Sequence, residues 1–147
     1  YDANAPADMV VTLHACDTAT DYALHNAVCR GARMILSVPC CQHELNGQIA
    51  SDKLKLITRY GIIKERFAAL MTDAIRANLL ESRGYKTQVL EFVDLSHTPK
   101  NLLIRAIKKR PALDNAGRIA LDEAKALMEE FSLEPTLYSL LYPHSAD

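Results

Sequence analysis

Two short segments of the chain gather side chains that can transfer protons, bind metals or act as nucleophiles. The first is Leu-His-Ala-Cys-Asp at residues 13–17, and the second is Pro-Cys-Cys-Gln-His at residues 39–43. A histidine titrates close to neutral pH, so His14 is a candidate general base, and Asp17 could orient it. Asp17 could equally cap a helix that follows it. The second segment adds four catalytic candidates, namely Cys40, Cys41, Gln42 and His43.

The thiols of these segments permit two further kinds of chemistry. Cys16 with Cys40 or Cys41 could form a redox disulfide, and the same thiols with the nearby histidines are ligand types that zinc prefers. However, the chain has no Cys-x-x-Cys pair, and adjacent cysteines in extended backbone point to opposite sides. We therefore expect no metal site, and we interpret these cysteines as thiols packed near the end of a sheet.

Each segment lies at the end of an apolar run with the length and the β-branched residues of a buried strand. The first run spans residues 8–16, with both faces expected to be buried, and the second spans residues 33–38. Between them a helix should follow a cap at Asp17 or Thr18, with Asp21 placed as in a capping box three residues after Thr18, and Gly31 can end it. Strand, helix and strand make a βαβ unit with parallel strands. Because ligands bind outside the carboxyl ends of such strands, we expect the two segments to face each other across a crevice.

The rest of the chain predicts further helices and one more strand. A helical region with one interruption is expected over residues 52–83, followed by a strand at residues 85–95. Residues 100–110 are interpreted as a basic helix and residues 118–147 as a helical C-terminal extension. The fold class is therefore α/β, with about three strands that are parallel at least in part and with flanking helices. Three strands are few for an open sheet, so we expect residues 1–147 to be one domain that is part of a larger one.

Composition narrows the classes of protein to consider. The chain has 147 residues, of which 49% are hydrophobic and 24% charged, and its net charge is −1. These values are typical of a globular domain without a general attraction for nucleic acid or anionic membranes. No apolar run approaches the roughly 20 residues that span a bilayer, so we expect no membrane partner. Four cysteines, two of them adjacent, do not form the pattern of a secreted disulfide scaffold, which favours the cytoplasm.

Four motifs taken together resemble a known family. In chain order they are LHACDTATD, VPCCQHEL, TDAIRANLLESRGY and EFVDLSHTPKNLLIRA. They are similar to the C-terminal half of a class I S-adenosylmethionine-dependent methyltransferase, over about residues 8–141. The resemblance implies a Rossmann-like sheet, of which this chain carries the fourth, fifth and sixth of seven strands. It also implies that the glycine-rich cofactor loop, which this chain lacks, lies upstream of Tyr1.

The resemblance also implies a division of roles among residues. Leu13, His14 and Ala15 would line S-adenosylmethionine, with most cofactor contacts made by residues upstream of the chain. The residues that face the substrate would include Pro39, Lys100, Asn101 and Arg105. Asp73 and Arg76 match the family, and we expect them to be structural and to form an ion pair one helical turn apart.

The expected activity is cytoplasmic methyl transfer, with the acceptor unknown and RNA as the default by analogy. The basic residues of the segment 100–110 would be either a solvated face or a track for RNA phosphates. The alternative is a non-enzymatic binding or dimerisation module that lacks the cofactor half. In either case a half-sheet leaves one strand edge unpaired, so we expect the isolated chain to self-associate.

Overall fold

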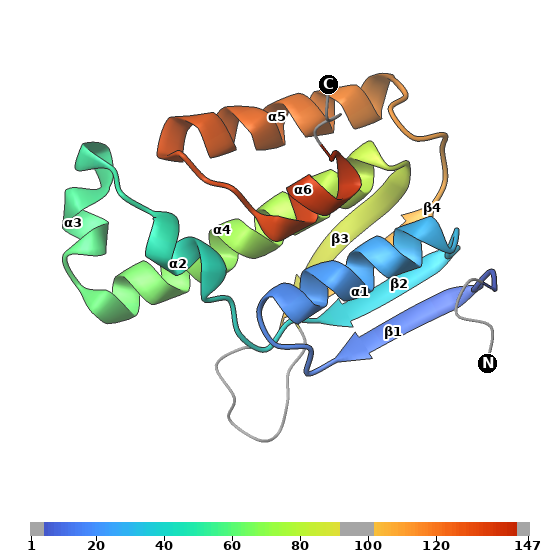
Figure 1. Cartoon of the computed structure of the whole chain (residues 1–147), viewed down its shortest axis with the longest axis horizontal. Helices are drawn as coiled ribbons and strands as arrows, with labels where there is room; N and C mark the ends of the chain where they lie inside the picture. Colours follow the sequence, from blue (N-terminus) through green and yellow to red (C-terminus); the bar gives the residue numbers. More distant parts are fainter. Residues whose placement is uncertain (1–4, 92–101, 144–147) are drawn as a thin grey trace.

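Four strands form a mixed sheet in the computed structural model of the chain, which describes residues 5–91 and 102–143. The strands are β1 (Met9–Leu13), β2 (Met34–Val38), β3 (Tyr85–Glu91) and β4 (Leu102–Lys108). Their order across the sheet is β1-β2-β4-β3, with β1 and β2 parallel and β4 antiparallel to both of its neighbours (Figure 1). The expected α/β class with a partly parallel sheet is therefore confirmed.

Two layers of helices lie on one face of this sheet. The first layer contains α1 (Thr18–Cys29) and α4 (Gly61–Ser82). Outside it, α5 (Asn115–Phe131) packs on α4, and α6 (Thr136–Leu141) packs on α1 and α4 (Figure 1). Three short helices, α2 (Glu44–Gln48), the 3-10 helix η1 (Asp52–Leu54) and α3 (Lys55–Thr58), connect β2 to α4. The helical region expected over residues 52–83 is thus confirmed, and its interruption falls just before Gly61. None of the described helices is both long enough and apolar enough to cross a bilayer.

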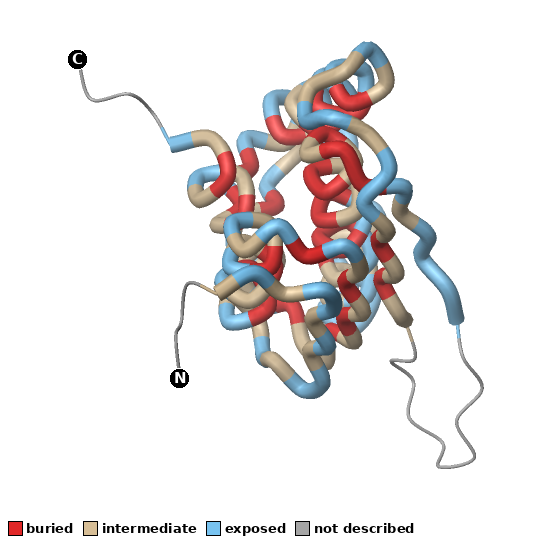
Figure 2. Tube along the Cα trace, turned by 90° about the vertical axis from the view of Figure 1, so that its right-hand side faces the viewer, coloured by how far each residue is buried: buried red, intermediate tan, exposed pale blue. Residues whose placement is uncertain are grey.

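The hydrophobic core lies between the sheet and the first helical layer. Figure 2 shows the buried residues gathered in the interior, where the helices meet the strands. Its fully buried members include Leu24 of α1, Ile35 of β2, Leu79 of α4 and Ile104 of β4. Truncating one such residue to alanine typically costs about 2–5 kcal/mol, so this core fixes the relative positions of α1, β2, α4 and β4.

The expected helix over residues 100–110 is wrong, because its described part is the central strand β4. Leu102–Lys108 pairs with β2 on one side and with β3 on the other. Ile104 and Ala106 point into the core, while Arg105 lies on the opposite face of the sheet, beside Gln88. The leucines, lysines and arginines of this segment favour a helix locally, but strand pairing on both sides overrides that preference.

The expectation that both faces of the first strand are buried is also wrong. Met9, Val11 and Leu13 of β1 are 55%, 49% and 62% exposed. They lie on the face of the sheet that the described helices leave uncovered, and β1 is an edge strand. The apolar run therefore predicts the strand correctly, but it does not distinguish buried from exposed apolar side chains.

Candidate functional site

The two chemistry-bearing segments leave neighbouring strands at the same edge of the sheet. β1 and β2 pair in parallel register, with Leu13 opposite Val38, the last residue of each strand. Residues 14–17 and 39–43 therefore begin side by side. The expected meeting of the two segments is confirmed.

Asp17 connects the two segments through its backbone and its side chain. Its N–H donates to the carbonyl of Cys41 at 3.1 Å. Its Oδ1 accepts hydrogen bonds from the backbone N–H groups of His43 (2.9 Å) and Glu44 (3.0 Å). The carboxylate thus lies at the N-terminus of α2, where a negative charge is stabilised. The expectation that Asp17 caps the helix following it is wrong, because its side chain makes no cap bond to α1.

The backbone around Asp17 adopts a conformation that few residues other than glycine adopt. His14 has φ of 57°, and Asp17 has φ of 48° with ψ of −124°. Such conformations cost about 1–3 kcal/mol each and persist only where surrounding contacts impose them. Those contacts include Thr20 Oγ1, which donates to the carbonyl of Ala15 at 2.6 Å, and Arg76 Nη2, which donates to the carbonyl of Asp17 at 2.9 Å.

A buried ionic network beneath the segments holds this turn in place. Arg76 of α4, which is 1% exposed, donates from Nε and Nη2 to the two carboxylate oxygens of Asp21 at 2.8 and 2.9 Å. Its Nη1 donates to Asp73 at 3.1 Å, so the expected ion pair one turn apart on α4 is confirmed. The expected capping role of Asp21 is wrong, because α1 has no side-chain cap bond and the Asp21 carboxylate binds Arg76 instead.

Burial acts on the charges of this network in opposite ways. Burial lowers the pKa of the Arg76 guanidinium, but the hydrogen bonds and charges of Asp21 and Asp73 outweigh it and hold that pKa above its usual value. Burial raises the pKa of the Asp73 carboxyl above 3.8, and the lowering effects of Arg76 and Gln42 do not fully offset it. The ionised form of Asp73 is therefore less favoured in the fold than in water, in spite of its pairing with Arg76.

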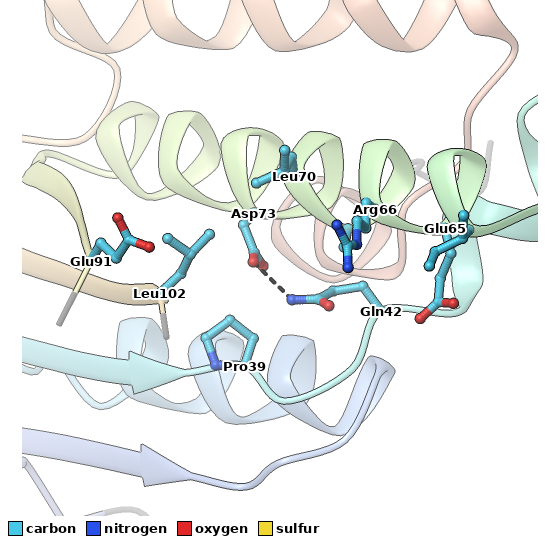
Figure 3. A pocket seen from close by; sticks show the side chains of 10 residues that line it. Pro39, Gln42, Glu65, Arg66, Leu70, Asp73, Glu91 and Leu102 are labelled. Carbon is cyan, nitrogen blue, oxygen red and sulfur yellow. Dashed lines mark hydrogen bonds between the residues drawn. The ribbon is translucent and has the colours of Figure 1, made fainter. Parts of the chain in front are cut away.

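Gln42 extends the network into a cavity of about 460 Å³. Its Nε2 donates to Asp73 Oδ2 at 2.8 Å, and the residue is 4% exposed (Figure 3). Its Oε1 is buried and has no hydrogen-bond partner among the described residues. The cavity is also lined by Pro39 at the end of β2 and by Glu65 and Arg66 on α4. Sequence patterns gave no signal for Glu65 or Arg66, because they come from the far end of α4.

Three thiols converge at the strand ends. The Sγ atoms of Cys16 and Cys40 lie 3.2 Å apart, those of Cys40 and Cys41 lie 4.0 Å apart, and all three lie within 4.8 Å of one another. The expectation that Cys40 and Cys41 point to opposite sides is wrong, because β2 ends at Val38 and both cysteines follow in the irregular segment after it. Hydrogen bonding with Cys40 and then with Cys41 raises the pKa of the Cys16 thiol to about 11.

The remaining residues predicted for the site lie in several places. His14 and His43 are exposed, on the first and second segments respectively. Arg105 donates to Gln88 at 2.8 Å on the uncovered face of the sheet and does not line the cavity. Lys100 and Asn101 lie outside the described residues.

The predicted basic helix face does not exist in the described part of residues 100–110. Lys108 donates to the carbonyl of Arg83 and lies over the ring of Tyr85, with its Nζ 4.9 Å from the ring centre. Arg110 pairs with Glu81 at 3.2 Å. Lys108 and Arg110 therefore bond to residues at the end of α4, beside β3, and do not form a continuous solvent-exposed basic face.

Residues 2–48 match a methyltransferase domain. The matched segment contains β1, α1, β2 and both chemistry-bearing segments, and it ends with α2. Comparisons with curated proteins and with solved structures found no match. The family match supports methyl transfer in general as the reaction class, and methyltransferases of this kind use a cofactor of the S-adenosylmethionine type.

Proposed function

We propose that the chain is part of an S-adenosylmethionine-dependent methyltransferase whose methyl acceptor binds in the cavity beside Gln42. One observation carries the proposal: the segment that matches a methyltransferase domain contributes the strand ends, and Pro39 and Gln42 of that segment border the cavity. Ligands of parallel α/β sheets bind at such strand ends.

The end of β1 fits one side of the cofactor. S-adenosylmethionine supplies an electrophilic methyl group on a sulfonium ion. Leu13 and His14 are exposed, and together with Ala15 they offer an apolar surface and an imidazole to a ligand at the end of β1. The carboxylate of Asp17 is already bonded to the backbone at the start of α2, so we assign it to positioning the segments and not to orienting His14.

The cavity favours a methyl-accepting substrate that carries hydrogen-bond donors. Leaving a buried oxygen such as Gln42 Oε1 without a hydrogen bond costs about 1–3 kcal/mol. An N–H or O–H group of the substrate bound to this oxygen would recover that free energy. Among the described residues that line the cavity, the carboxylates of Glu65 and Glu91 accompany the guanidinium of Arg66, while Asp73 is already paired with Arg76. This described lining has no excess of positive charge that would favour a phosphate, and it suits an amine, an amide or a nucleobase. RNA that inserts one base into the cavity remains the first methyl acceptor to test.

The decisive test is calorimetric titration of S-adenosylmethionine into the full-length protein that contains this chain. We expect binding at micromolar strength, and replacing His14 by alanine should weaken it or slow turnover. His25 on α1 provides the matched control, because it lies outside the strand-end segments. A folded protein that takes up no S-adenosylmethionine would refute the proposal.

The acceptor side has its own test. Transfer of a labelled methyl group is measured separately on total RNA and on protein. Gln42→Met should lower kcat/KM about 5- to 150-fold, the equivalent of about 1–3 kcal/mol of lost hydrogen bonding. Gln48→Met is the control, because Gln48 bonds to the backbone of Glu134 at the far end of α2. Equal effects of the two changes would remove Gln42 from the acceptor site.

The exposed edge of β1 favours a second function, that of a binding or dimerisation module without catalysis. Its uncovered apolar side chains are Met9, Val11 and Leu13. An unpaired strand with such side chains is a template for pairing with another chain. If the full-length protein binds no S-adenosylmethionine but forms a dimer that Val11→Lys abolishes, this module is the better description.

A further inference from the structure

The thiols of Cys16, Cys40 and Cys41 have the spacing of metal ligands. Zinc–sulfur bonds of about 2.3 Å in a tetrahedral site place neighbouring sulfurs about 3.8 Å apart. The separations of 3.2 and 4.0 Å lie on either side of this value, and the third is at most 4.8 Å. Side-chain movements of about 1 Å or less would bring all three sulfurs to the spacing of three corners of the tetrahedron.

The backbone that carries these thiols is held from several directions. Cys41 accepts the N–H of Asp17 through its carbonyl, which fixes the two segments to each other one residue away from Cys16. The Asp17 carboxylate holds the backbone just after Cys41, at His43 and Glu44. A preorganised set of ligands of this kind binds a metal without first ordering the chain.

We propose that Cys16, Cys40 and Cys41 bind one Zn²⁺ ion and leave its fourth coordination position open. Thiolates select zinc over harder cations such as magnesium and calcium. The fourth position faces solvent, because Cys16 is exposed while Cys40 and Cys41 are half-buried. Three protein ligands with an open position are typical of a zinc ion that binds water or substrate, in contrast to a closed structural site.

A disulfide between Cys16 and Cys40 would use only two of the three thiols. The sulfurs are 3.2 Å apart, close enough to bond after a small movement and oxidation by a disulfide such as oxidised glutathione. Cys41 would then have no part, although its sulfur lies 4.0 Å from that of Cys40. The convergence of all three thiols therefore favours the metal.

The test uses the full-length protein, reduced and freed of metal with a chelator. Titration with Co²⁺ should produce the thiolate-to-cobalt charge-transfer absorption, saturating at one ion per chain, and Zn²⁺ should displace it. Serine at position 16, 40 or 41 removes a ligand (Cys16→Ser, Cys40→Ser, Cys41→Ser). Because loss of an outer-shell partner alone weakens metal sites about 10- to 100-fold, loss of a ligand should weaken binding at least about 100-fold.

Cys29 provides a matched control on the same chain. It ends α1, is exposed, and lies beside His25 with 3.4 Å between its Sγ and the ring nitrogen. Cys29→Ser should leave metal binding unchanged. A measurement on the wild-type chain avoids any folding defect of the variants: saturating Zn²⁺ should slow alkylation of the three clustered thiols and not that of Cys29.

Four results would overturn the proposal. The first two are the absence of the charge-transfer band in the folded, reduced protein and metal binding that survives Cys41→Ser. The other two are alkylation of the three thiols that Zn²⁺ does not slow, and formation of a Cys16–Cys40 disulfide by oxidised glutathione at the same rate with and without Zn²⁺. A zinc ion at this place does not depend on methyl transfer, so failure of S-adenosylmethionine to bind leaves this inference standing.

Discussion

Arg76 is the side chain whose loss should most strongly destabilise the fold and the site together. Its guanidinium makes four hydrogen bonds, two to Asp21, one to Asp73 and one to the carbonyl of Asp17. Arg76→Met keeps an unbranched side chain but removes the positive charge. Two buried carboxylates would then face each other without a cation, and the Asp17 carbonyl would lose its donor.

The expected loss follows from these contacts. Removing one partner of a buried ion pair costs about 3–5 kcal/mol. The partly buried Asp17 carbonyl, left without its donor, adds at most about 1–3 kcal/mol. The sum, about 4–8 kcal/mol, is comparable with the whole stability of a domain, about 5–15 kcal/mol. We therefore expect Arg76→Met to be largely unfolded or to unfold at far lower denaturant.

Urea unfolding at neutral pH, followed by circular dichroism, measures this loss. Arg66→Met is the control, because Arg66 lies on the same helix but is exposed. Its effect should stay within about 0.5 kcal/mol. Adding Asp21→Asn and Asp73→Asn to Arg76→Met should recover part of the stability, since the unpaired charges are then gone. A loss below about 1 kcal/mol in Arg76→Met, at an unchanged m-value, would refute the reasoning.

Three further predictions concern the backbone, the pH dependence and the assembly. Gly84→Ala should lower stability by about 3 kcal/mol or more, because φ at this position is +89° and the added Cβ would lie 2.2 Å from the carbonyl oxygen of Arg110. Gly31→Ala is the comparison: φ is +65° but no atom lies within 4 Å of the added Cβ, so the loss in the same urea assay should be only about 1–2 kcal/mol. The raised pKa of Asp73 means that the folded state binds the proton of this carboxyl more tightly than the unfolded state, so stability falls as pH rises from about 3.8 through that raised pKa. In Asp73→Asn the urea midpoint should fall less steeply over the same pH interval. A dependence of the midpoint on pH as steep as in the wild type would contradict this prediction. The isolated chain should sediment as a concentration-dependent dimer that Val11→Lys prevents, and a monomer at every concentration would disprove self-association.

The sequence predicted α1, β1 and β2 correctly, because apolar runs, spacing of apolar residues and a helix-ending glycine indicate these elements locally. Residues 18–29 form a helix that ends before Gly31, whose φ of +65° is one that glycine adopts without penalty. The apolar runs before the two segments became β1 and β2, and their parallel pairing brought the strand ends together. This much of the candidate site could be derived, because consecutive strand, helix and strand have few possible arrangements.

Contacts between distant residues decided what the sequence could not show. β4 is a strand because β2 and β3 pair with it, and nothing within its own seven residues indicates those partners. The Asp17 carboxylate binds backbone groups 26 and 27 residues away, so its role as a cap for α2 was not visible beside α1. The cysteines converge because Cys40 and Cys41 lie beyond the strand, where the alternation of side chains no longer applies.

The position of Arg76 and Asp73 on α4 has a consequence for how the site is acquired during folding. The bonds from Arg76 to Asp21 and from Gln42 to Asp73 join residues 55 and 31 positions apart. Residues 2–48, which match a methyltransferase domain, therefore contain the strand-end side chains that we propose for the site but not helix α4, which holds them. During synthesis, residues 2–48 emerge from the ribosome before α4. At that stage the two strand-end segments lack the bonds to Arg76 and Asp73 that hold them in the folded chain. The turn at Asp17 should become ordered only when α4 docks, and substitutions in one turn of that helix can move both halves of the site at once.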